Sequence, residues 1–169
     1  MRTLLLMRHA KSDWGFEDLS DFARPLNKRG QRAARRMGQW LADNNLTPDH
    51  VICSTACRAQ ETLHGVRQRT QLSNRQISYE KRGYLADLNT LLQILAEAPE
   101  TDLVLLIGHN PGMEALLTYL CDAEPLRSTT KTAMPTATLA QITLPDEWQD
   151  LQRHSGELVQ LIQPKTLDA

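Results

Sequence analysis

The run of apolar residues from Leu103 to Ile107 is the feature that most constrains the fold. A strand with apolar side chains on both faces is typical of the centre of a parallel sheet, because helices cover both sides of such a sheet. Other short apolar runs alternate with helical patterns along the chain, which indicates an α/β domain. The sequence therefore predicts a three-layer αβα sandwich with a mostly parallel central sheet.

The other elements of this sandwich are predicted from hydrophobic periodicity and from capping signals. Asn110 would cap the helix that follows the central strand, with Pro111 as its first residue. Polar residues and Pro145 between the last two strands suit a hairpin-like connection. We expect strands at about 2–7, 51–53, 77–79, 137–144 and 157–162, and helices at about 27–45, 55–69 and 88–97.

Length, composition and charge limit the classes of function. At 169 residues the chain fits a single domain that covers residues 1–169. A hydrophobic content of 41% with 23% charged residues is ordinary for a globular protein. The net charge of −1 argues against nucleic acid as a partner, because binding to phosphate backbones requires a clear positive excess.

The sequence also indicates the subcellular location of the protein. The apolar run at residues 4–7 is too short for the core of a signal peptide, and no run is long enough for a transmembrane helix. Three cysteines are an odd number in a chain large enough to fold without disulfides, which favours free thiols in a reducing compartment. We expect a cytoplasmic monomer with no membrane attachment.

Arginine and histidine side chains follow three of the expected strands. Arg8 and His9 follow the first strand, Arg58 lies at the start of the helix after the second, and His109 follows the central strand. Ligands of open α/β sheets bind beyond the carboxyl ends of the strands, so these side chains are expected to converge. Arginine matches phosphate oxygens with a fork of donors, and helix amino termini add backbone donors. We therefore expect these residues to bind a phosphoryl group.

Histidine can attack a phosphoryl group through a neutral ring nitrogen while arginines stabilise the oxygens. Taken singly, each of these four residues fits a surface turn, a core histidine or a solvated helix position, and only their joint placement favours a site. No aspartate cluster suggests magnesium, so we expect no metal and no cofactor. The five histidines show no HxH or HExxH spacing: His9, His50, His64, His109 and His154.

The segment Met7-Arg8-His9-Ala10-Lys11-Ser12 resembles the opening motif of the histidine phosphatase superfamily, which includes phosphoglycerate mutases and acid phosphatases. Further stretches resemble other motifs of this superfamily, and together they span nearly the whole chain. These stretches are residues 24–30, which begin Arg-Pro-Leu-Asn, 53–62 around the second arginine, 104–112 around the second histidine, and 135–137.

The resemblance implies a phosphoglycerate mutase-like fold and assigns roles to the residues. It implies that His9 is phosphorylated, that Arg8 and Arg58 hold the phosphate, and that His109 donates to its oxygens. We expect Ser12 and Asn110 to help bind the substrate. The small size, the Arg-His-Ala-Lys-Ser opening and Tyr-Leu-Ala at 84–86 resemble the SixA-type phosphohistidine phosphatases. This resemblance implies a metal-independent phosphatase that acts on phosphohistidine of a protein partner.

The chain departs from the superfamily pattern at two points. Ala10 stands where much of the superfamily has glycine, which affects how closely the backbone can approach a ligand. Mutases and many ester phosphatases use a carboxylate as general acid, and here Glu80 and Asp87 are candidates that we leave unassigned. A missing acid fits a phosphoramidate substrate, because imidazole can leave as a neutral group. A small-molecule phosphomonoesterase and a non-catalytic phosphate-binding module are the alternatives.

Two further features have more than one interpretation. The basic residues Lys28, Arg29, Arg32, Arg35 and Arg36 lie on one side of their helix, opposite its apolar side. They form either a solvated face or a docking surface for an acidic protein partner such as a phosphorelay domain. Long irregular segments at 12–25 and 122–135 are expected walls of the active site. Three aromatic residues of the first segment either cover the pocket or pack the loop: Trp14, Phe16 and Phe22.

Overall fold

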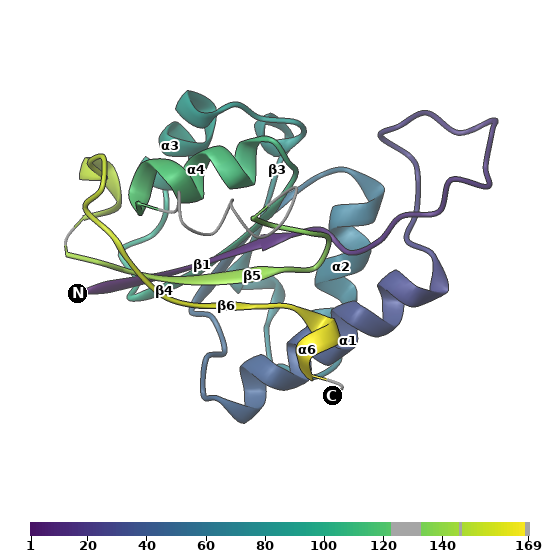
Figure 1. Cartoon of the computed structure of the whole chain (residues 1–169), viewed down its shortest axis with the longest axis horizontal. Helices are drawn as coiled ribbons and strands as arrows, with labels where there is room; N and C mark the ends of the chain where they lie inside the picture. Colours follow the sequence, from purple (N-terminus) through teal and green to yellow (C-terminus); the bar gives the residue numbers. More distant parts are fainter. Residues whose placement is uncertain (123–132, 146, 168–169) are drawn as a thin grey trace.

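A six-stranded sheet runs through the centre of the molecule (Figure 1). The structure is a computed structural model that describes residues 1–122, 133–145 and 147–167. The strand order is β3-β2-β4-β1-β5-β6, and β5 is the one strand that runs antiparallel to the other five. The strands are β1 (Arg2–Arg8), β2 (His50–Ser54), β3 (Ile77–Glu80), β4 (Leu103–Gly108), β5 (Leu139–Leu144) and β6 (Glu157–Ile162).

Helices cover both faces of this sheet. In Figure 1, α1 (Lys28–Asp43) and α2 (Cys57–Arg67) pack together on one face, and α3 (Leu88–Ala96) and α4 (Gly112–Leu120) lie on the other. The short helix α6 (Pro164–Leu167) follows β6. This arrangement confirms the predicted three-layer sandwich with a mostly parallel sheet. No helix in the described part of the chain is both long and apolar enough to cross a membrane.

The central strands are apolar on both faces because each face belongs to a different core. In β4, Val104 and Leu106 face the core beneath α3 and α4, whereas Leu105 and Ile107 face the core beneath α1 and α2. All four side chains are buried. Side chains of a strand alternate between its two faces, so every side chain of a strand that is covered on both sides faces an apolar core. The predicted location of this strand is confirmed.

The register of the parallel strands sets the position of the candidate site. Arg8 at the end of β1 pairs with Gly108 at the end of β4, and Cys53 of β2 pairs with Ile107. The residues that follow these positions therefore emerge at one edge of the sheet. The backbone N–H of His9 also donates to the carbonyl oxygen of Gly108, at 3.0 Å. The predicted convergence of strand ends thus follows from the pairing register.

Several element boundaries differ from those predicted. Helix α2 begins at Cys57 and has no side-chain cap, two residues after the predicted start. Helix α4 begins at Gly112, not at Pro111, yet Asn110 Oδ1 still accepts from the backbone N–H of Glu114 at 3.2 Å. Strand β5 begins at Leu139, because Ala137 has a φ of 60°, which is incompatible with an extended strand. The antiparallel pairing of β5 and β6 confirms the hairpin-like connection.

The contact between α1 and α2 leads to a stability prediction. A Cβ added at Gly38 would lie 2.7 Å and 2.8 Å from the backbone oxygen and Cα of Val66. Alanine in a helix gains about 1 kcal/mol over glycine, but overpacking against backbone costs about 1–3 kcal/mol or more. We therefore expect Gly38→Ala to lower the free energy of unfolding by about 1 kcal/mol or more, as measured by urea denaturation.

Gly83→Ala is the matched control, because a Cβ there would meet its nearest atom, Ser54 Cα, at an ordinary 3.5 Å. We expect its stability to be unchanged or slightly increased. A Gly38→Ala variant as stable as the parent would contradict the close packing of the two helices.

Candidate active site

A cavity of about 350 Å³ opens beyond the carboxyl ends of β1, β2 and β4. It is lined by all six residues that the sequence predicted: Arg8, His9, Ser12, Arg58, His109 and Asn110. Lys11, Trp14, Arg24, Leu85 and Thr136 complete the lining. The structure therefore brings together residues that are more than a hundred positions apart, in the place where α/β sheets bind ligands.

His9 is oriented with one ring nitrogen towards the protein backbone. Its Nδ1 lies 2.7 Å from the carbonyl oxygen of Ala10. Because a carbonyl oxygen only accepts hydrogen bonds, Nδ1 must carry the ring proton and Nε2 must hold a lone pair. Nε2 accepts a hydrogen bond from Nε of Arg58 at 3.3 Å. The tautomer that leaves Nε2 nucleophilic is thus fixed by a backbone carbonyl.

Burial keeps His9 neutral. The side chain is only 6% exposed, and its burial, followed by the positive charges of Arg58 and Arg8, lowers the pKa of His9 to about 4. A cationic ring could not act as a nucleophile, because both nitrogens would carry protons. The environment therefore keeps His9 neutral, with a free lone pair on Nε2, near neutral pH.

Arg58 is held against His9 by Asp21, a residue that the sequence analysis did not identify. Nη1 of Arg58 donates to the backbone oxygen of Asp21 at 2.6 Å, and Nη2 donates to its Oδ2 at 3.0 Å. Arg58 is buried, with 3% of its side chain exposed. A guanidinium group has more N–H donors than these bonds use, so Arg58 keeps donors for a ligand.

Asp21 connects several groups at the cavity. Its carboxylate accepts from Nη1 of Arg24 at 2.6 Å and from the hydroxyl group of Tyr84. The hydrogen bonds from Tyr84, Arg24 and Arg58 hold the pKa of the Asp21 carboxyl well below its usual range. Asp21 is therefore an anion that positions the two arginines, and it is a poor proton donor.

His109 lies opposite His9, with the ring centroids 5.1 Å apart. Burial, together with nearby His9 and Arg58, lowers the pKa of His109 to about 3, so this ring is also neutral. Its Nε2 lies 2.8 Å from Oγ of Ser54, which itself accepts from the backbone N–H of Ala56 at 3.2 Å. This leaves the Ser54 hydroxyl proton available for Nε2, in which case His109 would keep its own proton on Nδ1.

Two buried nitrogen atoms of the cavity residues have no hydrogen-bond partner in the described part of the chain. They are Nε of Arg8 and Nδ1 of His109. Arg8 is otherwise anchored through Nη1, which donates to the backbone oxygen of Met134 at 3.2 Å. Buried polar atoms are nearly always paired, so orphaned nitrogens on two of the lining residues fit a site that receives an anionic ligand.

Ser12 and Asn110 line the cavity, but their side chains already have protein partners. Ser12 Oγ accepts from Nε of Arg24 at 3.0 Å. Asn110 Nδ2 donates to the backbone oxygen of Met134 at 2.9 Å. Both residues thus hold neighbouring parts of the wall in place. Arg24 also lines the cavity, although no role was predicted for it from the sequence.

The segment between β1 and α1 extends away from the sheet (Figure 1). Trp14 lines the cavity, and its ring packs under the guanidinium group of Arg24, with 3.6 Å from Cζ to the ring centroid. Phe22 instead packs edge-on against Tyr84, and Phe16 is exposed. The first predicted wall therefore contributes to the site, whereas most of the second, at 123–132, lies outside the described residues.

The structure explains the three positions at which the chain departs from the superfamily pattern or offers a candidate acid, which are Ala10, Glu80 and Asp87. The N–H of Ala10 donates to Oγ1 of Thr62 at 2.9 Å, and Ala10 is fully buried, so its methyl group fits the core. Glu80 binds Arg82, and Asp87 caps α3 by accepting from the N–H of Thr90 at 2.9 Å. Neither carboxylate lines the cavity. In the described residues, no three His, Cys, Asp or Glu side chains are grouped as a metal site.

The chain is similar to known proteins in both sequence and structure. The family model of the histidine phosphatase superfamily (branch 1) matches residues 4–82. An uncharacterized protein of Mycobacterium leprae is 34% identical over 94% of this chain and 100% of its own length. Phosphohistidine phosphatase SixA of Escherichia coli is 30% identical, over 83% of this chain and 84% of that protein. A structure assigned to SixA from Nakamurella multipartitia has a TM-score of 0.81 at 29% identity, with 96% of both chains covered.

The chain therefore belongs to the histidine phosphatase superfamily, and this membership supports a phosphatase. Within the superfamily, its similarity to SixA-type phosphohistidine phosphatases extends to both sequence and structure.

The environment of His9 gives a prediction about pH. Because burial lowers the pKa of His9 to about 4, we expect its ring to stay neutral between about pH 5 and pH 8. Protonation below that range should remove the nucleophilic lone pair, so the rate of phosphoryl transfer should fall only as the pH drops through the pKa. NMR titration of the His9 Cε1–H signal, assigned with His9→Ala, measures this directly. Titration of that signal near the ordinary histidine pKa would contradict the buried neutral ring.

Proposed function

We propose that this protein is a metal-independent phosphatase that forms a phosphohistidine intermediate on His9 and dephosphorylates phosphohistidine on a protein partner. One observation carries the proposal: Nδ1 of His9 is tied to a backbone carbonyl, so that a neutral Nε2 lies beside Arg58 in a cavity rich in donors. Membership of the histidine phosphatase superfamily and similarity to SixA support the same chemistry.

In the first step, Nε2 of His9 attacks phosphorus, and the bond between phosphorus and the substrate imidazole breaks. The bonding electron pair leaves with the imidazole nitrogen. Phosphorylation makes the His9 ring cationic, and the hydrogen bond from Nδ1–H to the Ala10 oxygen stabilises that charge. Arg8 and Arg58 stabilise the phosphoryl oxygens, with His109 as a further donor.

In the second step, water attacks phosphorus and the bond to His9 breaks. The electron pair returns to Nε2, inorganic phosphate leaves, and the water proton passes to phosphate or solvent. The neutral ring that burial favours is restored at this point. The cycle therefore begins and ends with the same tautomer of His9, and it requires positive charge only from arginines.

The surroundings of the carboxylates support phosphohistidine as the substrate. Asp21 forms ion pairs with Arg24 and Arg58, and its hydrogen bonds keep it ionised. Glu80 and Asp87 do not line the cavity. An alkoxide leaving group needs a proton donor, whereas imidazole leaves as a neutral group when its other nitrogen carries a proton. The site is thus better suited to phosphoramidates than to alkyl esters.

We further propose that the protein acts as a cytoplasmic monomer. The described cysteines Cys53, Cys57 and Cys121 are all free thiols, which supports a reducing compartment.

The nucleophile can be identified by trapping. Brief incubation with labelled phosphoramidate, followed by a quench that avoids acid, should place phosphate on His9, and mass spectrometry should locate it there. His9→Ala should lose nearly all turnover, and Arg58→Ala should lose about 100-fold or more, the scale of removing one preorganised donor. Arg75→Ala, an exposed arginine outside the cavity, is the control. The parent protein should remain fully active in the presence of EDTA. Label on a cysteine or serine, or loss of activity on chelation, would refute the mechanism.

The substrate class can be tested with a series of leaving groups. We expect kcat/KM to be high for phosphohistidine, phosphoramidate and p-nitrophenyl phosphate, and low for phosphoserine and sugar phosphates, because no carboxylate among the described lining residues can protonate an alkoxide. The rates should follow the pKa of the leaving group. Glu80→Gln and Asp87→Asn should leave the series unchanged. Alkyl phosphates cleaved as fast as phosphohistidine would instead favour a small-molecule phosphomonoesterase.

A further inference from the structure

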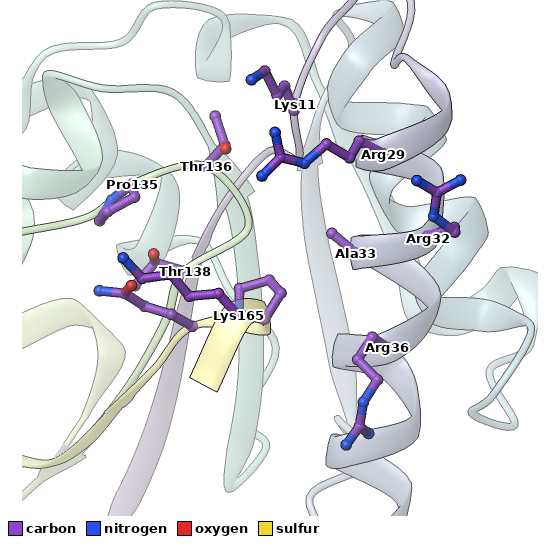
Figure 2. A pocket seen from close by; sticks show the side chains of 11 residues that line it. Lys11, Arg29, Arg32, Ala33, Arg36, Pro135, Thr136, Thr138 and Lys165 are labelled. Carbon is purple, nitrogen blue, oxygen red and sulfur yellow. The ribbon is translucent and has the colours of Figure 1, made fainter. Parts of the chain in front are cut away.

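A second cavity, of about 640 Å³, adjoins the active site, and it shares Lys11 and Thr136 with the cavity that contains His9. Figure 2 shows Arg29, Arg32 and Arg36 of α1 along one side of it. Thr138 and Lys165 lie across from them, from the segment before β5 and from α6. We name this space the basic cavity. The predicted basic face of α1 is therefore partly a wall of a hollow and not only a convex solvated surface.

The basic cavity is strongly and unevenly charged. Lys11, Arg29, Arg32 and Lys165 are exposed lining residues, and none of them forms an ion pair with any residue that the structure describes. Its lining, within the described ranges, contains no aspartate or glutamate. Surface cations are usually interspersed with anions, so this concentration of one sign produces a positive potential directed at the cavity.

A second observation, independent of the charges, also points to a ligand. Thr138 lines the basic cavity with a fully buried side chain, and its Oγ1 has no hydrogen-bond partner in the described part of the chain. Buried hydroxyl groups are nearly always paired. A carboxylate or phosphate oxygen in the cavity could accept a hydrogen bond from this hydroxyl, as well as from the flanking cations.

The spacing of the arginines indicates the shape of the ligand. Arg29, Arg32 and Arg36 are separated by three and four positions, so they lie on one side of α1. Their Cα atoms extend over about 10 Å along the helix, at about 1.5 Å per residue. A single phosphate group would occupy only part of this row. Nη2 of Arg36 already donates to the backbone oxygen of Leu167 at 2.9 Å, which leaves the other two arginines to contact the ligand. A polypeptide segment with several carboxylates could contact both Arg29 and Arg32, and it could continue past Lys11 into the active-site cavity.

We propose that the basic cavity binds an acidic segment of the phosphorylated protein, next to the histidine whose phosphate is removed in the active site. This inference rests on the proposed function, since it assigns the protein substrate a second point of contact. The phosphorylated side chain would enter the cavity of His9 while neighbouring aspartate or glutamate residues lie along α1. The basic cavity is then a determinant of specificity and takes no part in the chemical steps.

The test compares two phosphohistidine peptides of equal length, one flanked by Asp and Glu and the other by Asn and Gln. The test variant is Arg29→Gln/Arg32→Gln/Lys165→Gln. The matched control is Arg75→Gln/Lys81→Gln/Arg153→Gln, which removes the same charge from exposed positions outside both cavities. Hydrolysis of p-nitrophenyl phosphate reports the chemistry alone. A bisphosphorylated sugar serves as a small polyanion for comparison.

We expect the parent protein to prefer the acidic peptide about tenfold in kcat/KM at low salt, because several charge pairs act together. The preference should disappear in the test variant, persist in the control variant, and weaken as salt increases. Hydrolysis of p-nitrophenyl phosphate should be unchanged in both variants.

Equal rates on the two peptides, or a preference that survives in the test variant, would overturn the acidic-segment site while the proposed function stands. Loss of rate in the test variant on the sugar but not on the acidic peptide would assign the cavity to small polyanions. Cleavage of p-nitrophenyl phosphate but of neither peptide would overturn the proposed function, and the acidic-segment site with it.

Discussion

The parallel pairing of β1 with β4 is the constraint on which the rest of the site depends. Because Arg8 pairs with Gly108, the two histidines that follow these residues are placed side by side by backbone hydrogen bonds. A shift of one residue would turn the side chains of β1 to the opposite faces of the sheet and would disturb both cores. The geometry of the candidate site is thus stabilised by the same apolar burial that stabilises the sheet.

The site combines buried neutral rings with permanent charges. Burial disfavours charge on both histidines, whereas a guanidinium group resists deprotonation. Positive charge in the cavity is therefore carried by arginines and a free nitrogen lone pair by His9, and the two properties do not compete for one proton. Asp21 links these parts, because it anchors Arg58 and Arg24 and balances some of their charge.

Strand ends and helix starts have local signals, which were sufficient to predict the sandwich and the convergence of Arg8, His9, Arg58 and His109, whereas Ser12 was expected only from the resemblance to the superfamily. The apolar run Leu103–Ile107 is typical of a strand covered on both faces. Asn27 is a polar residue at the start of a periodic segment, and it caps α1. Asp21 could not be predicted in this way. It belongs to a long irregular segment without periodicity, and its partner Tyr84 lies 63 positions away. The hollow beside α1 was also beyond prediction, since it is formed by elements from opposite ends of the chain.

The strand order has a consequence for synthesis on the ribosome. Strand β1 is made first, yet its two neighbours are β4 and β5, so Thr3 finds its pairing partners only at Leu103 and Thr143. Until those residues emerge, β1 exposes an apolar strand with two open edges, a state that favours aggregation. We infer that the nascent chain passes through a long interval in which the apolar strand β1 must be shielded, until β4 and β5 have been made.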